Sequence, residues 1–205
     1  MSTVAIAPGG SGVRDYVLRR AEPGDLAEAR SVMLDTVYRD FGHGYLPQWH
    51  FDIIDLASHY LEPEDNTLFV AEQDGAVVAT AGVRALTPTS PPHPVEATSP
   101  FEPGRTATLY RVYVRPEHRR QGLAGALVDT CLDFIASRER YTGIYLHTDA
   151  RTPGAVEFWS KRGTIICDER LAPRGTASED AEPFQTVHFA LEMRRRGDHG
   201  GRAAG

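Results

Sequence analysis

The chain has 205 residues, of which 41% are hydrophobic and 24% are charged, and this composition indicates one globular domain rather than a disordered or fibrous chain. A formal net charge of −6 argues against general binding to nucleic acid or to an anionic membrane surface. The sequence has only two cysteines, no apolar run of membrane-spanning length and no signal-peptide pattern, so we expect a cytoplasmic protein.

The first half of the chain predicts one strand, then two helices, then a hairpin of two strands. Residues 1–14 are expected to form a disordered leader, and the folded domain is expected to span 15–193. A strand at 16–20 precedes a helix that opens at Pro23, and a second helix is predicted from Trp49 to Leu61. Strands over 66–73 and 77–86 flank Asp74-Gly75, which is a typical hairpin turn.

The second half alternates strands and helices. Residues 87–105 are rich in Pro, Ser and Thr and are predicted to form a long functional or mobile loop. Strands follow at 109–114, 143–148, 164–168 and 186–193, with helices at 121–138 and 153–162. A polar excursion is expected at 175–183 and a disordered tail at 194–205. This order indicates one mixed sheet with helices on both faces.

The turn between the strand 109–114 and the helix 121–138 carries four basic residues and then three small ones. The basic residues are Arg115, His118, Arg119 and Arg120, and the small ones are Gly122, Ala124 and Gly125. Free backbone N–H groups at the start of a helix favour an anion, and small residues let a phosphate approach them. The alternative is a plain solvated surface. Neither a dinucleotide fingerprint nor a nucleotide P-loop fits these residues.

This segment resembles the cofactor motif of the GNAT superfamily of acyl-CoA N-acyltransferases. The motif, Arg/Gln-x-x-Gly-x-Gly/Ala, is present as Arg119-Arg120-Gln121-Gly122-Leu123-Ala124, after a strand that ends Val114-Arg115-Pro116. The resemblance covers about Asn66 to Thr164 and is looser from Tyr16 onward. It implies an α/β (α+β) fold with a single mixed, mostly antiparallel twisted sheet of about six to seven strands.

The resemblance implies acetyl-CoA as cofactor, with coenzyme A as product. Backbone groups of Val112, Tyr113 and Val114 would hold the pantetheine arm, and one N–H there would polarise the thioester carbonyl. The remaining cofactor-binding candidates are Arg119, Arg120, Gln121, Gly122, Leu123, Ala124, Gly125, Thr152 and Trp159.

The catalytic groups are less well defined by the motif. His147 shares one face of its strand with Tyr145 and lies where related enzymes often carry a glutamate base, and an imidazole with a pKa of about 6.5 suits that role. The alternative is a hydrogen-bonded sheet residue. Trp159 stands where the tyrosine general acid is common, and Thr152 where an asparagine often contacts the cofactor. Because Trp cannot donate a proton to a thiolate, Tyr113, Tyr145 or water would have to serve.

The acceptor is expected to be a primary amine of a small molecule, which attacks the thioester directly. Aromatic and acidic side chains between Tyr38 and Tyr60 could bind an amine with an apolar body; the alternative is that most of these aromatic side chains belong to the core. Two other functions stay open: a non-catalytic acyl-CoA-binding or regulatory module, and a peptide or protein N-terminal acetyltransferase. No histidine spacing indicates a metal site, and a homodimer is left open.

Overall fold

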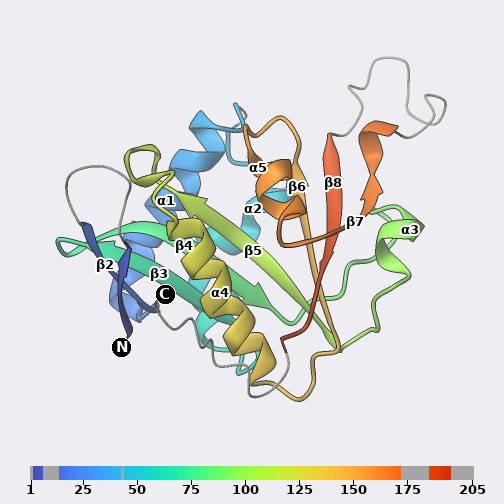
Figure 1. Ribbon diagram of the computed structural model, residues 1–205, viewed down its shortest axis with the longest axis horizontal. Coiled ribbons are helices and arrows are strands. Elements are labelled where there is room, and N and C mark those ends of the chain that lie inside the picture. Colours follow the sequence, from blue (N-terminus) through green and yellow to red (C-terminus); the bar gives the residue numbers. More distant parts are fainter. Residues whose placement is uncertain (1, 7–13, 43, 172–184, 195–205) are drawn as a thin grey trace, which may run out of the picture.

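A computed structural model describes residues 2–6, 14–42, 44–171 and 185–194 of the protein, and all described strands belong to one sheet (Figure 1). The strand order is β1-β2-β3-β4-β5-β6-β8-β7, and the only parallel pair among these strands is β5–β6. The strands are β1 (Ser2–Ile6), β2 (Arg14–Arg20), β3 (Thr67–Gln73), β4 (Ala76–Arg84), β5 (Thr106–Val114), β6 (Gly143–Asp149), β7 (Gly163–Asp168) and β8 (Thr186–Leu191).

All seven predicted strands are present, and the mixed, mostly antiparallel sheet is confirmed. The eighth strand, β1, pairs with β2 inside the segment that we expected to be a disordered leader. That expectation is therefore wrong for residues 2–6, whereas residues 7–13, the excursion at 175–183 and the tail beyond Arg194 lie outside the described residues. Arg194 itself forms ion pairs at 2.5 Å with Asp129 and Asp133 of α4 (Leu123–Ala136).

The predicted hairpin is formed as its turn residues require. Asp74 and Gly75 between β3 and β4 have φ values of 52° and 81°, the left-handed conformation that a two-residue hairpin loop needs.

Two layers of helix cover the two faces of the sheet. Helix α4 and the short α5 (Ala155–Ser160) lie on the front face in Figure 1 and pack on one core through Leu127, Val128 and Trp159. Helix α1 (Leu26–Arg39), α2 (Pro47–Ile54) and a π-helical turn, η2 (Ala57–Leu61), pack on a second core through Met33, Ile53 and Tyr60. The helix predicted from Trp49 to Leu61 is thus two pieces, which break at Asp55.

The remaining helical segments are short. They are the 3-10 turns η1 (Pro23–Asp25), η3 (Pro116–His118) and η4 (Glu169–Leu171), and the single turn α3 (Val95–Thr98) within the long loop between β4 and β5. No helix among the described residues is both long and apolar enough to span a membrane.

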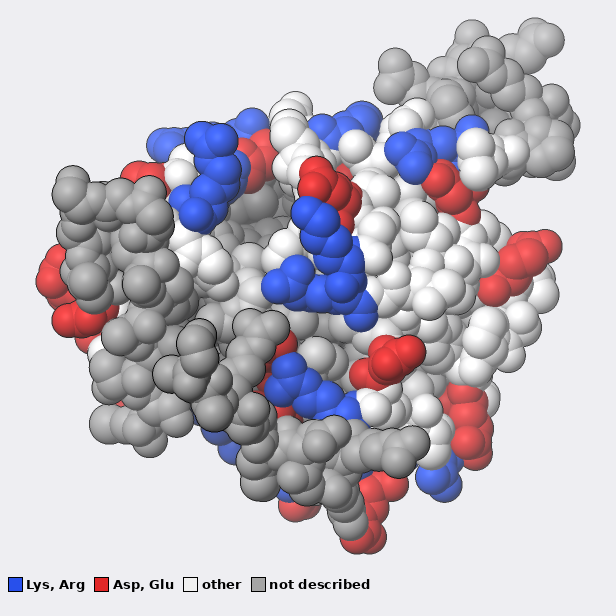
Figure 2. Space-filling model, in the orientation of Figure 1, with Lys and Arg blue, Asp and Glu red and all other residues white. Residues whose placement is uncertain are grey.

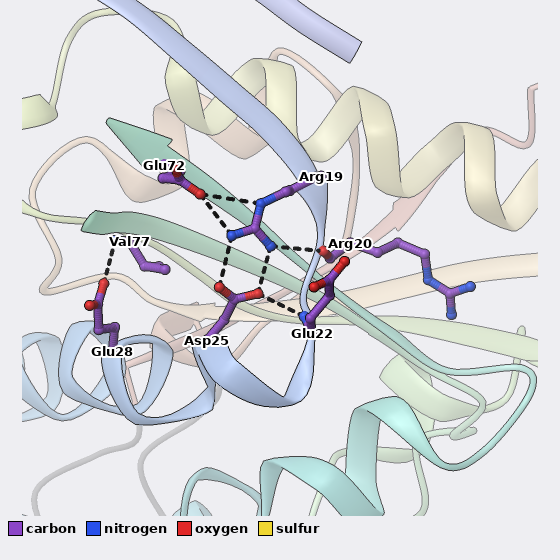
Figure 3. A network of polar contacts seen from close by, with 7 residues as sticks. All are labelled: Arg19, Arg20, Glu22, Asp25, Glu28, Glu72 and Val77. Atoms are coloured by element: carbon purple, nitrogen blue, oxygen red, sulfur yellow. Dashed lines mark hydrogen bonds and ion pairs between the residues drawn. The ribbon is translucent and has the colours of Figure 1, made fainter. Parts of the chain in front are cut away.

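A guanidinium at the start of α1 fixes this helix to the sheet (Figure 3). Arg19 of β2 donates to both carboxylate oxygens of Asp25, at 2.6 and 2.8 Å, and to Glu72 of β3 at 2.7 Å. Beside it, Glu28 of α1 accepts a hydrogen bond of 2.7 Å from the backbone N–H of Val77 in β4. Three strands are thereby joined to the first turn of the helix.

Candidate active site

The sheet opens between β5 and β6. These parallel strands pair only at Thr106–Gly143, Ala107–Ile144 and Thr108–Tyr145. Beyond Thr108, β5 continues its pairing with β4 as far as Val114, while β6 continues with β8 as far as Asp149. The second halves of the two strands, which carry Tyr113 and His147, therefore face each other across an opening.

A β-bulge reorients the second half of β5. Thr80 and Gly82 of β4 oppose Tyr113 and Tyr110, so two residues of β5, Arg111 and Val112, stand opposite one residue of β4. Arg111 has a φ of 53°, and its carbonyl accepts a 2.8 Å hydrogen bond from the Thr80 hydroxyl. As a result Val112 packs toward the α4 core and Tyr113 toward the α1 core.

The turn after β5 leads into α4, and no side chain of the described segments caps the N-terminus of this helix. Arg120 and Gly122 have φ values of 57° and 78°, and the N-cap Gly122 provides no side-chain cap. The first N–H groups of α4 have no intrahelical partner, and neither the exposed Gly122 nor the small Ala124 shields them. The 120–125 segment is therefore a suitable site for an anion.

The basic side chains before this segment have other partners. Arg115 forms an ion pair with Asp35 at 2.5 Å, and Arg119 pairs with Asp40, both on or next to α1. The hydroxyl of Tyr16 donates to Gln121 Oε1 at 2.9 Å and lies 3.0 Å from His118 Nδ1. Arg115, His118 and Arg119 therefore fasten the turn to α1 and β2, and their contribution to anion binding stays a prediction.

Arg162, which the sequence analysis did not single out, supplies charge in their place. A Cβ atom on Gly125 would lie 2.6 Å from Arg162 Nη2, so this guanidinium reaches the first turn of α4. Its Cζ stacks 4.1 Å from the centre of the Phe158 ring. Figure 2 shows Lys and Arg side chains gathered in the middle of the face that α4 and α5 cover.

The α1 side of the opening carries a buried ion pair. Arg111 donates to Asp52 at 2.5 and 3.0 Å, and Tyr60 donates to the same carboxylate at 2.5 Å. Burial opposes ionisation of Asp52, but the hydrogen bonds and the charge of Arg111 outweigh it and lower the pKa of the carboxyl. Asp52 and Tyr60 therefore belong to the core, whereas the aromatic side chains of Tyr38, Trp49 and Phe51 are exposed.

His147 lies at the centre of an aromatic and histidine cluster. Its ring is 5.0 Å from that of His93 in the long loop, and its Nδ1 lies 3.3 Å from the hydroxyl of Tyr145. The same hydroxyl lies 2.7 Å from Nδ1 of His188, whose Nε2 lies 2.6 Å from Glu169 Oε1. The sequence did not indicate Glu169, His188 or His93, because these residues are far apart in the chain. They come together only through the register of β6 and β8 and the path of the long loop between β4 and β5.

Other predicted residues occupy different surroundings. Tyr113 does not join the His147 cluster, and instead its hydroxyl accepts a hydrogen bond of 3.3 Å from Arg111 and its ring contacts Phe41. Trp159 is buried in the α4 core against Phe158, so packing alone explains a large aromatic side chain at this position. Thr152 lies in the turn before α5. Contact of either residue with a cofactor stays a prediction. No group of three or more His, Cys, Asp or Glu side chains in the described part of the chain could hold a metal ion.

An open helix start beside two parting parallel strands is characteristic of the acyl-CoA N-acyltransferase class, and comparison with known proteins agrees. The model of the acetyltransferase (GNAT) family matches residues 32–164, and the chain belongs to this family.

Curated relatives and solved structures add detail. N-acetyltransferase 8 of Rattus norvegicus is 36% identical over 115 residues, which cover 56% of this chain and 46% of that protein. For the Homo sapiens protein of that name the identity is 32% over 112 residues, covering 55% and 44%. The chain therefore spans about half the length of these relatives.

Two solved structures share the fold. A GNAT-family acetyltransferase from Staphylococcus aureus Mu50 superposes with a TM-score of 0.63 at 16% identity, covering 86% of this chain and 99% of that one. The ribosomal-protein-S18-alanine N-acetyltransferase from Escherichia coli gives 0.56 at 19% identity, covering 90% and 97%.

Proposed function

We propose that this protein transfers the acetyl group of acetyl-CoA to a primary amine of a small molecule. The observation that carries the proposal is the open start of α4, which lies next to the opening between β5 and β6. The 120–125 segment offers N–H groups for the pyrophosphate, and backbone groups of Val112, Tyr113 and Val114 lie along the strand edge where the pantetheine arm would run.

A cation beside these N–H groups supports an anionic ligand. The start of a helix carries partial positive charge, and the Arg162 guanidinium next to Gly125 adds a full one, so this region favours an anion. The residues present therefore fit a diphosphate. When bound, acetyl-CoA supplies the activated thioester, and the protein positions it and handles the proton.

Two side chains across the opening suit the two proton transfers of an acyl transfer. His147 can accept the proton that the attacking amine loses. Tyr113 accepts a hydrogen bond from Arg111, which leaves its own proton for the departing thiolate. Tyr145 is a poorer acid, because burial raises the pKa of its phenol and its hydroxyl lies between two histidines.

The exposed aromatic side chains of Tyr38, Trp49 and Phe51 support an acceptor with an apolar body. The experiment is an assay of thiol release from acetyl-CoA with a panel of free amines and peptides, together with calorimetry of coenzyme A binding. Release with free amines supports the proposal. Activity on peptides alone indicates an N-terminal acetyltransferase, and tight binding without release under any condition indicates a binding module.

The cofactor site is tested by Gly122→Glu, which places a carboxylate at the anion site in a left-handed backbone conformation. We expect coenzyme A binding to be lost. The matched control is Gly104→Glu, which introduces the same side chain at a φ of 75° in the turn before β5, at the opposite end of that strand. Equal affinity in the two variants would remove the site assignment.

A further inference from the structure

A chain of hydrogen bonds leads from His147 to the edge of the protein. It runs from His147 to Tyr145 (3.3 Å), from Tyr145 to His188 (2.7 Å) and from His188 to Glu169 (2.6 Å). His188 is completely buried, and the Glu169 side chain is 16% exposed. Three elements contribute: β6 supplies Tyr145 and His147, β8 supplies His188, and η4 supplies Glu169.

The carboxylate at one end sets the direction of every bond in this chain. An ionised carboxylate only accepts hydrogen bonds, so His188 donates to Glu169 from Nε2. The Nδ1 atom of a neutral His188 then accepts the proton of the Tyr145 hydroxyl. The Tyr145 oxygen in turn accepts from Nδ1 of His147, and this leaves Nε2 of His147 with an unprotonated lone pair.

The surroundings of His147 keep that lone pair available. The side chain is exposed to solvent, yet the protein around it lowers the pKa of its imidazole, first by desolvation and then through His93, His188 and Arg111. A neutral imidazole at this place can accept a proton without first losing one.

We propose that Tyr145, His188 and Glu169 are positioning residues that hold His147 in the Nδ1–H tautomer, so that its Nε2 atom is the base for the acceptor amine. The inference rests on the proposed function. In the step, an N–H bond of the amine breaks and an Nε2–H bond forms, while the electron pair stays on the nitrogen that attacks the thioester.

The tautomer is measured directly by ¹⁵N NMR of histidine-labelled protein at neutral pH, without substrate. We expect the Nδ1–H form for His147 in the wild type and a shift toward the Nε2–H form in Tyr145→Phe, which keeps the ring against Phe101 but removes the hydroxyl. A wild-type His147 already in the Nε2–H form would overturn the proposal, because the hydrogen bonds would then run in the opposite direction.

Kinetics give the second readout. We expect Tyr145→Phe to lower kcat roughly 10- to 100-fold with an unchanged KM for acetyl-CoA, a smaller effect than the 10²–10⁴-fold typical of a general base itself. His188→Gln should retain most of the activity, since its amide can donate to Glu169 and accept from Tyr145, whereas His188→Leu should resemble Tyr145→Phe.

The matched control is Tyr141→Phe, which removes a hydroxyl that donates to the Asp65 carbonyl at 2.6 Å, outside this chain of bonds. Its kcat should stay at the wild-type level. If the wild type releases thiol with amines but Tyr145→Phe retains full kcat, the positioning role fails while the proposed function stands. A wild type without activity on any amine would instead reject the proposed function, and the NMR result would still decide the tautomer.

Discussion

The position of Arg162 indicates the charge of the ligand that this site would bind. Its guanidinium reaches the first turn of α4, where the helix already presents partial positive charge, and Gly125 is small enough to admit it. Stacking on Phe158 holds the planar group in place. A positive side chain beside the start of a helix favours an anion there, which supports the proposed diphosphate site.

We therefore expect Arg162→Ala to weaken coenzyme A binding by about tenfold, which corresponds to roughly 1.4 kcal/mol and is modest for a charge-assisted hydrogen bond. Calorimetry measures the effect. The neighbouring Lys161→Ala is the control, because Lys161 pairs with Glu157 at 2.6 Å on the exposed surface of α5. Equal losses in both variants would point to general surface charge instead of a specific contact.

At the scale of the strand, the bulge in β5 depends on close packing between β4 and η2. A Cβ atom on Gly82 would lie 2.5 Å from Cε1 of Tyr60, so the glycine lets this buried ring approach β4 closely. The Tyr60 hydroxyl in turn binds Asp52, which holds Arg111 at the bulge. Burial raises the pKa of the Tyr60 phenol, which keeps it protonated as a donor.

Gly82→Ala should therefore destabilise the protein by about 1–3 kcal/mol, the usual cost of overpacking a core. It should also lower acetyl transfer, since a displaced Tyr60 disturbs Asp52 and Arg111. Urea denaturation measures the first effect and the thiol assay the second. Gly24→Ala serves as control, because nothing lies within 4 Å of its Cβ position. A Gly82→Ala protein as stable as this control would contradict the packing argument.

The elements of this fold follow from local patterns, whereas their contacts do not. The alternating apolar residues of the hairpin and the Asp74-Gly75 turn predict β3 and β4, and small residues after a basic turn predict the open start of α4. Residues 2–6 have no such pattern, so β1 could be recognised only from its pairing with β2. The break at Asp55 was likewise hidden, because both helical pieces share one apolar periodicity.

Only the part of the candidate site that backbone groups form could be predicted from the sequence. The 120–125 segment acts through N–H groups, so six adjacent residues identify it. The side-chain part depends on the register of β6 and β8, which sets His147 opposite His188, and on a loop that brings His93 over them. The contacts of Arg162 likewise depend on how the helices pack, and those of Arg111 depend on the bulge in β5. No spacing along the chain reveals such contacts.

At the scale of the whole molecule, one cluster of charges connects helix α1 to the sheet. Arg19 lies in β2 and binds Asp25 at the start of α1 and Glu72 in β3, with its own side chain 17% exposed (Figure 3). The hydrogen bond from Arg19 is the main cause that lowers the pKa of Asp25, ahead of the opposing effect of burial. Asp25 also accepts a 2.7 Å hydrogen bond from the backbone N–H of Glu22, which fixes the entry into the helix.

The sign of the resulting acid sensitivity follows from this lowered pKa. A carboxyl whose pKa is lower in the folded than in the unfolded state stabilises the protein at pH values above its unfolded pKa of about 3.9. This contribution is lost as the pH falls through the folded pKa. Arg19→Ala should thus cost about 2 kcal/mol at pH 7, between the values for exposed and buried ion pairs. The difference from the wild type should shrink below about pH 4, as Asp25 becomes protonated.

Urea denaturation of both proteins at several pH values between 7 and 2.5 measures this difference. The matched control is Arg170→Ala, since Arg170 pairs with Asp168 at 2.6 Å but is 39% exposed, and its removal should cost less than about 1 kcal/mol at pH 7. If Arg19→Ala lost no more stability than this control, or lost equally at all pH values, the Asp25–Arg19–Glu72 cluster would not be what joins α1 to the sheet. The anchorage would then rest on the apolar contacts of α1, such as those of Met33 and Val37, and on its other polar contacts, such as that of Glu28 with Val77.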